Sequence, residues 1–166
     1  MNLIILKQLS VLSAIAGAML GFVTLIPYVG YISFLVAFVF LSAFMICYLK
    51  RNDLIGIINV QEGAIYGAVI GIVSFAAFLI VLAPLASILG LIIDKLGGNY
   101  PLGFFVYLFN NIGSFFFSTI PLAIFAILMS ALFNGFSGMV TAWGSELITG
   151  FKKENDQNNS IDFEIK

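Results

Sequence analysis

The sequence contains no histidine and only one cysteine, Cys47. The absence of histidine excludes serine-histidine-aspartate and cysteine-histidine catalytic sets, histidine-ligated haem and most transition-metal sites. A single cysteine also excludes an internal disulfide. We therefore expect Cys47 to be a buried thiol. Its position one turn before Lys50 and Arg51 leaves attachment of a lipid as the second interpretation.

Charge is also scarce, because charged residues make up only 9% of the chain while apolar residues make up 61%. An average soluble domain has about 25% charged residues, so this composition excludes an ordinary soluble domain and a disordered chain. Seven basic residues stand against eight acidic ones, without the basic stripe that nucleic-acid binding requires. The sequence therefore predicts an all-α integral membrane protein. Its main partner is the lipid bilayer, and nucleic acid is not a partner.

The few chemistry-bearing residues do not indicate an enzyme. Metal-assisted or carboxylate catalysis needs converging ligands or two acids with separated pKa values. No second acidic residue lies at helical spacing from any of the candidate carboxylates, which are Asp53, Glu62 and Asp94. Gly97 and Gly98 do not open a helix with the lysine that a phosphate-binding loop requires. We therefore expect no catalytic residue, no cofactor and no metal.

Long apolar runs separated by polar segments predict four transmembrane helices in two hairpins. A hydrocarbon core about 30 Å thick needs about 20 apolar residues in a helix, and a helix satisfies its own backbone groups without water. The first hairpin turns at Pro27 to Gly30, where glycine can adopt a positive φ. The third run is too long for one upright span, and Pro84 offers a kink there. The expected spans are residues 9–26, 31–49, 64–93 and 119–149.

Residues 102–118 are apolar but carry Asn110 and Asn111 at their middle, so their membrane position is ambiguous. Basic residues prefer the cytoplasmic side of short loops. If this segment lies in the interface or re-enters the membrane, Lys95 is the one basic residue on the outer side of the membrane. If it crosses as a fifth span, the basic residues divide almost evenly. We therefore expect an interfacial or re-entrant segment before the last helix. Both termini are then cytoplasmic, in the plasma (inner) membrane of a bacterial-type cell.

This topology divides the chain into a transmembrane helical domain, residues 1–150, and a polar cytoplasmic tail, residues 151–166. Lys152 and Lys153 follow the last span directly and stop its insertion. We expect the remainder of the tail to be a frayed terminus. Addition of residues 161–165 as a strand to a partner sheet is the alternative.

Glycine recurs every four residues in two of the expected spans, at Gly17 and Gly21 and at Gly63, Gly67 and Gly71. Residues i and i+4 share one face of a helix. Small residues on that face allow the close backbone approach that holds helices together in lipid, a glycine zipper. These five glycines are therefore predicted helix-packing residues. We expect their seams to lie within one chain, with a homo-oligomer as the second interpretation.

Uncharged polar residues share one face of the last expected span: Ser130, Asn134, Ser137 and Thr141. An amide in hydrocarbon needs hydrogen-bond partners. The first interpretation is that these side chains bond to neighbouring helices or to backbone carbonyls. The second is that they line a polar path for a solute, because polar residues inside a membrane often mark functional sites.

These observations lead to two expected functions. The first is a non-catalytic packing or accessory protein held by small-residue helix seams. The second is a small channel or carrier for an uncharged or lipid-like solute. Ion-coupled carriers usually place a carboxylate at membrane depth, whereas Asp94 lies in a loop and Glu146 lies close to Lys152. Coupling to protons is therefore disfavoured.

Overall fold

The computed structural model describes residues 3–26, 28–52, 54–56, 58–95 and 120–164. Within these ranges the chain forms helices and turns and no strand. Four helices are long and apolar enough to cross a membrane, which confirms the expected number of long apolar helices. Residues 102–118, where the interfacial or re-entrant segment was expected, lie outside the described residues. The four candidate spans are Ile5–Val23, Val29–Arg51, Val60–Ala86 and Ile120–Ile148.

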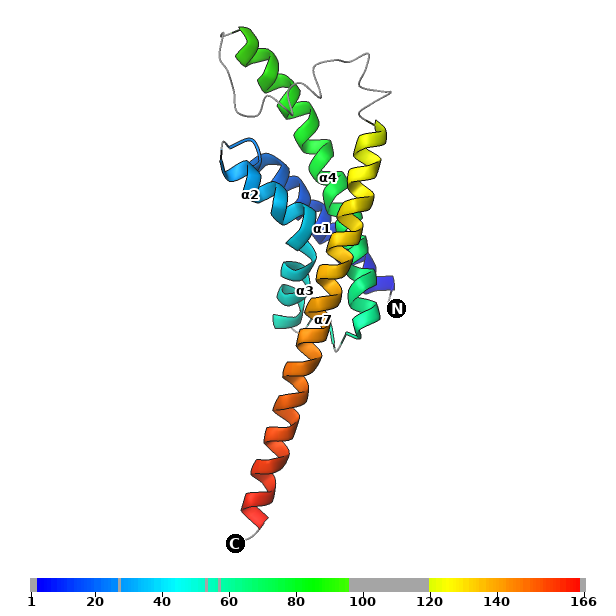
Figure 1. Cartoon of the computed structure of the whole chain (residues 1–166), viewed down its shortest axis with the longest axis vertical. Coiled ribbons are helices and arrows are strands. Elements are labelled where there is room, and N and C mark those ends of the chain that lie inside the picture. The colour runs from blue at the N-terminus through cyan, green and yellow to red at the C-terminus, as the bar shows by residue number, and fades with distance from the viewer. Residues whose placement is uncertain (1–2, 27, 53, 57, 96–119, 165–166) are drawn as a thin grey trace.

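Figure 1 shows the helices and their labels. The first is α1, and the second candidate span is divided into α2, a π-helical turn η1 and α3. The third, α4, continues through Pro84 without interruption. The last helix, α7, extends well past the expected end of the fourth span, so the tail is helical to Glu164 and not frayed. No proline interrupts this helix beyond its first turn, and most residues after Gly150 are compatible with a helix. The bounds are Leu3–Val23 (α1), Val29–Leu35 (α2), Val36–Phe40 (η1), Leu41–Arg51 (α3), Val60–Lys95 (α4) and Ile120–Glu164 (α7).

Helix α4 is the central element of the bundle. It makes its most extensive contacts with α7 and with α1. Helix α1 contacts α2 less extensively than it contacts α4. The sequence predicted a tight hairpin of the first two spans. The main partner of α1 is instead α4, a helix that comes later in the chain.

The connection between α1 and α2 is tied by hydroxyl groups. The hydroxyl oxygens of Thr24 and Ser33 each lie 2.7 Å from the carbonyl oxygen of Leu20 and 3.1 Å from each other. The positive φ of this turn, 66°, falls on Tyr28, and not on Gly30 as expected. Gly30 is required for space, because a Cβ at this position would collide with the carbonyl of Thr24.

Two apolar clusters fill the bundle. One contains side chains from α1, α3, α4, α7 and the segment after α3, including Leu9, Ile46 and Tyr66. The other is rich in aromatic rings, with Phe75 and Phe78 of α4 stacked at a centroid distance of 5.3 Å. Aromatic pairs in this range contribute about 0.5–1.5 kcal/mol beyond the area they bury. The clusters hold α4 against its neighbours along the length of the bundle.

The start of α1, the end of α3 and the start of α4 lie at the same end of the bundle (Figure 1). Lys50 and Arg51 lie in the last turn of α3, where positive charge is favourable near the helix C-terminus. At the start of α4, the backbone N–H of Asn59 donates to Glu62 Oε2 at 3.4 Å. This is one half of a capping box, which stabilises a helix N-terminus. Charged and capping groups therefore gather where the helices leave the bundle.

Candidate functional site

The seam between α4 and α7 is formed by backbone against backbone. A Cβ added to Gly71 would lie 2.6 Å from the carbonyl oxygen of Ser130, and one added to Gly67 would collide with the carbonyl of Asn134. Real Cβ atoms do not approach backbone this closely, so only glycine fits at both positions. The row of glycines on α4 thus lies directly on the polar face of α7.

Glycine on α7 completes this seam. A Cβ on Gly63 would lie 2.7 Å from the carbonyl oxygen of Gly138, and one on Gly138 would collide with the carbonyl of Gly63. Sequence reasoning did not assign Gly138 to a seam. The same spacing of four residues relates Asn134, Gly138 and Ala142 on α7. A search for all small residues at this spacing, and not for glycine alone, would have identified Gly138 as a packing residue.

The seam between α1 and α4 uses the other predicted row. A Cβ on Gly17 would collide with the carbonyl of Ser74, and one on Gly21 would lie 2.9 Å from the carbonyl oxygen of Phe78. In both seams the glycines face another helix of the same chain. Helix α4 is therefore held by close backbone contacts on two of its faces.

Asn134 is the centre of the polar contacts. Its side chain is fully buried, and its carboxamide reaches from α7 into the π-turn of the second span. The backbone N–H of Ser42 donates to Asn134 Oδ1 at 2.9 Å, and Asn134 Nδ2 donates to the carbonyl oxygen of Phe38 at 2.9 Å. The same Nδ2 lies 3.3 Å from the carbonyl oxygen of Ala37. Asn134 thus uses both its donor and its acceptor on one short stretch of backbone.

Ser42 strengthens this junction from the other side. Its hydroxyl is fully buried and donates to the backbone carbonyl oxygen of Asn134 at 2.6 Å. In a regular α-helix, the N–H of Ser42 donates to the carbonyl of Phe38, four residues earlier. Here each of these groups binds the Asn134 carboxamide. The amide is inserted where one helical hydrogen bond would lie, and a side chain inserted in this way is a known cause of helix bending.

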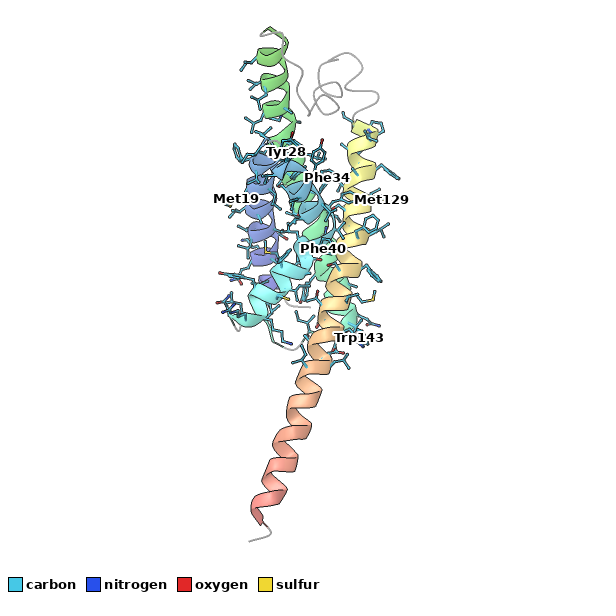
Figure 2. The ribbon with its side chains drawn as sticks, turned by 60° about the vertical axis from the view of Figure 1, so that its left-hand side comes forward. Met19, Tyr28, Phe34, Phe40, Met129 and Trp143 are labelled. Carbon is cyan, nitrogen blue, oxygen red and sulfur yellow. The ribbon has the colours of Figure 1, made fainter. Side chains whose placement is uncertain are left out.

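Figure 2 shows that the second span changes direction near Phe40. Proline and glycine are the usual local causes of a sharp bend, but residues 31–51 contain neither. Phe40 departs from ideal helical geometry, with φ −105° and ψ −7°. The break in this helix therefore follows from its contact with α7.

The other residues of the predicted polar path occupy different environments. Ser130 is fully buried, and its hydroxyl lies 3.2 Å from Asn134 Nδ2 and 3.4 Å from the carbonyl oxygen of Gly71. Ser137 and Thr141 are half-buried. The hydroxyl of Thr141 donates to the carbonyl oxygen of Ser137 at 2.8 Å, within its own helix. Asn110 and Asn111 lie outside the described residues.

Ser74 differs from these residues, because its buried hydroxyl has no hydrogen-bond partner in the described part of the chain. A buried polar group without a partner is destabilising. Replacing Ser74 with alanine is therefore expected to leave stability unchanged or to raise it by about 1 kcal/mol. Thermal unfolding of the purified protein in detergent measures this. A loss of more than about 1 kcal/mol would mean that the hydroxyl has a partner after all.

Cys47 is exposed on α3, which corrects the expectation of a buried thiol. It faces outward because the buried side of α3 is occupied by Met45, Ile46 and Leu49. Among the described residues, no group of three histidine, cysteine or carboxylate side chains is placed to hold a metal ion.

Comparison of the chain with protein-family models, with curated proteins and with solved structures finds no match.

Proposed function

We propose that the chain is a multi-pass membrane protein with four spans, and that it acts as a non-catalytic packing or accessory protein. The observation that carries this proposal is the reversed distribution of polarity. Ser13, Ser42 and Asn134 are essentially inaccessible, whereas Ile80 is 73% exposed and Leu132 is 68% exposed. In water such a surface is unfavourable, whereas in a bilayer lipid tails cover the apolar side chains and polar groups must be satisfied inside.

Aromatic side chains with polar tips support a position for the bilayer. Tyr28 and Tyr31 are exposed at one end of the bundle, and Tyr48 and Trp143 are exposed near the other end. Figure 2 labels Tyr28 and Trp143 at two separate levels along the long axis of the molecule. Tyrosine and tryptophan are enriched at both membrane interfaces. The hydrocarbon core therefore lies between these two levels.

Basic residues support the orientation. Lys7, Lys50 and Arg51 belong to the end of the bundle at which the chain begins and α3 terminates. Because basic residues are retained in the cytoplasm, we place this end and both termini there. The membrane that fits this arrangement is the plasma membrane of a bacterial-type cell.

The packing role rests on how the polar face of α7 is used. Asn134 and Ser130 bond to the second span, to α4 and to each other, and both are fully buried. Groups engaged in this way hold helices together and are not available to a passing solute. The contacts thus favour packing over the channel or carrier that is the alternative.

Cysteine labelling tests the topology. In a Cys47→Ala background, Tyr28→Cys is expected to react with a membrane-impermeant thiol reagent in intact cells. Asn52→Cys is expected to react only after the membrane is made permeable. Both side chains are exposed, so accessibility within the protein does not limit the reaction. The Cys47→Ala chain without an added cysteine is the control. Labelling of Asn52→Cys from outside contradicts the orientation.

Reconstitution tests the functional class. Vesicles that contain the protein are expected to retain entrapped uncharged solutes as well as vesicles of lipid alone. Release that depends on the protein, and that is lost in a folded Asn134→Leu variant, contradicts the packing role and establishes the carrier or channel.

A further inference from the structure

The second span has two ways of satisfying the backbone groups at its break. In the structure, the N–H of Ser42 and the carbonyl of Phe38 both bind the carboxamide of Asn134. If Asn134 is withdrawn, these two groups are the natural partners of each other in a regular α-helix. Neither arrangement leaves the N–H of Ser42 or the carbonyl of Phe38 without a partner. The second span can therefore convert between the two arrangements without losing a hydrogen bond at either of these two groups.

The local sequence favours the regular arrangement. π-Helical turns are rare and occur as single-turn insertions in α-helices. Residues 36–42 are Val-Ala-Phe-Val-Phe-Leu-Ser, with no proline or glycine to interrupt a helix. The π-turn therefore needs a cause outside its own sequence, and the contacts with α7 supply it.

The two arrangements place α3 differently. A π-turn accommodates one extra residue, and each residue of an α-helix turns the chain by about 100°. Conversion therefore rotates α3 by about 100° relative to α2 and removes the bend. With α2 held fixed, exposed Tyr48 moves toward the place now occupied by buried Leu49, and exposed Phe44 toward that of buried Met45. The orientation of α3 thus depends on whether Asn134 is inserted.

We propose that η1 is a conformational switch set by α7. The π-turn exists while the carboxamide of Asn134 occupies the break, and it becomes a regular α-helical turn when α7 moves away. A displacement of α7 is in this way converted into a rotation and straightening of the second span. This inference depends on contacts inside the chain and does not rest on the proposed accessory role.

Distance measurement between two spin labels tests the switch in the full chain. Ile32 is 68% exposed and Cys47 is exposed, and they lie on opposite sides of the break. Labels at Ile32→Cys and at the native Cys47 are expected to report a shorter distance in the native background than in Asn134→Leu. The variant should approach the value for a continuous helix, about 22 Å between Cα atoms. Ser137→Ala, on the same helix, is the matched control and should keep the native distance.

A deletion provides a second test that does not depend on the stability of Asn134→Leu alone. Phe40 is 45% exposed and lies in the π-turn. Its removal takes out the extra residue, so the flanking helices can join as one α-helix without rotation. Asn134 is then left without its partners in the break. In the chain that lacks Phe40, Asn134→Leu is expected to raise the melting temperature or leave it unchanged, whereas in the full-length chain it lowers it.

The outcomes decide the proposal. A longer distance in Asn134→Leu, together with a melting temperature that this substitution raises or leaves unchanged after deletion of Phe40, supports the switch. An unchanged distance means that the bend is intrinsic to residues 29–51. An equal loss of stability in both backgrounds, or failure of the chain without Phe40 to fold, also overturns the proposal. None of these outcomes depends on whether vesicles with the protein release solute, so the two proposals fail separately.

Discussion

Replacement of Gly67 by isoleucine is expected to separate α4 from α7 and to lower the free energy of unfolding by about 3 kcal/mol or more. Even the first carbon of the new side chain would collide with the carbonyl of Asn134 and would lie 3.0 Å from the Cα of Gly135. These atoms belong to a backbone, which cannot rotate away as a side chain does. The helices must therefore move apart, and the hydrogen bonds of Asn134 are strained at the same time.

Thermal unfolding in detergent measures this loss, and Gly144 offers a matched control. Gly144 lies on α7, and a Cβ added there would meet nothing within 4 Å. Gly144→Ile adds the same side chain to α7, the helix that Gly67 contacts, but without a collision. Its effect on the free energy of unfolding should therefore be within about 0.5 kcal/mol of zero. Equal melting temperatures for Gly67→Ile and the native protein are incompatible with the close seam.

Replacement of Asn134 by leucine is expected to cost about 2–4 kcal/mol of stability. The new side chain is similar in size but can neither accept from the N–H of Ser42 nor donate to the carbonyl of Phe38. If the π-turn persists, these buried groups lose their partners. If it converts to a regular turn, the packing of α3 is disturbed. Both routes destabilise the folded chain.

Chemical or thermal unfolding in detergent, followed by circular dichroism, measures the cost at Asn134. Ser137→Ala is the comparison, because Ser137 lies on the same face of α7 and is only half-buried. Its effect should stay within about 0.5 kcal/mol. Similar effects for the two substitutions argue that the carboxamide holds nothing in place.

Much of the fold follows from local sequence. Apolar runs of membrane length predict four helices, and four long apolar helices are present among the described residues. The start of a helix is harder to predict from apolar runs. Helix α4 begins at Val60, before the apolar run that starts at residue 64, because Asn59 and Glu62 form a polar helix start.

The candidate site was only partly predictable. Spacing of glycine and the position of an amide in mid-helix are local properties, and they drew attention to Gly67 and Asn134. The π-turn is not local, because residues 36–40 resemble any apolar helix. Its cause lies 92 residues away from Ser42 along the chain. A contact of this kind depends on which helices become neighbours, and a single sequence does not reveal it.

The pairing of α1 with α4 has a consequence for biosynthesis. Proteins are made from the N-terminus at about 5–20 residues per second, so α1 leaves the ribosome well before the helix that receives its glycines. Until α4 emerges, the face of α1 that carries Gly17 lacks the helix against which it packs. The first two spans therefore reach their final packing only after the later helices emerge, because α4 is the main partner of α1 and Asn134 of α7 binds the break in the second span.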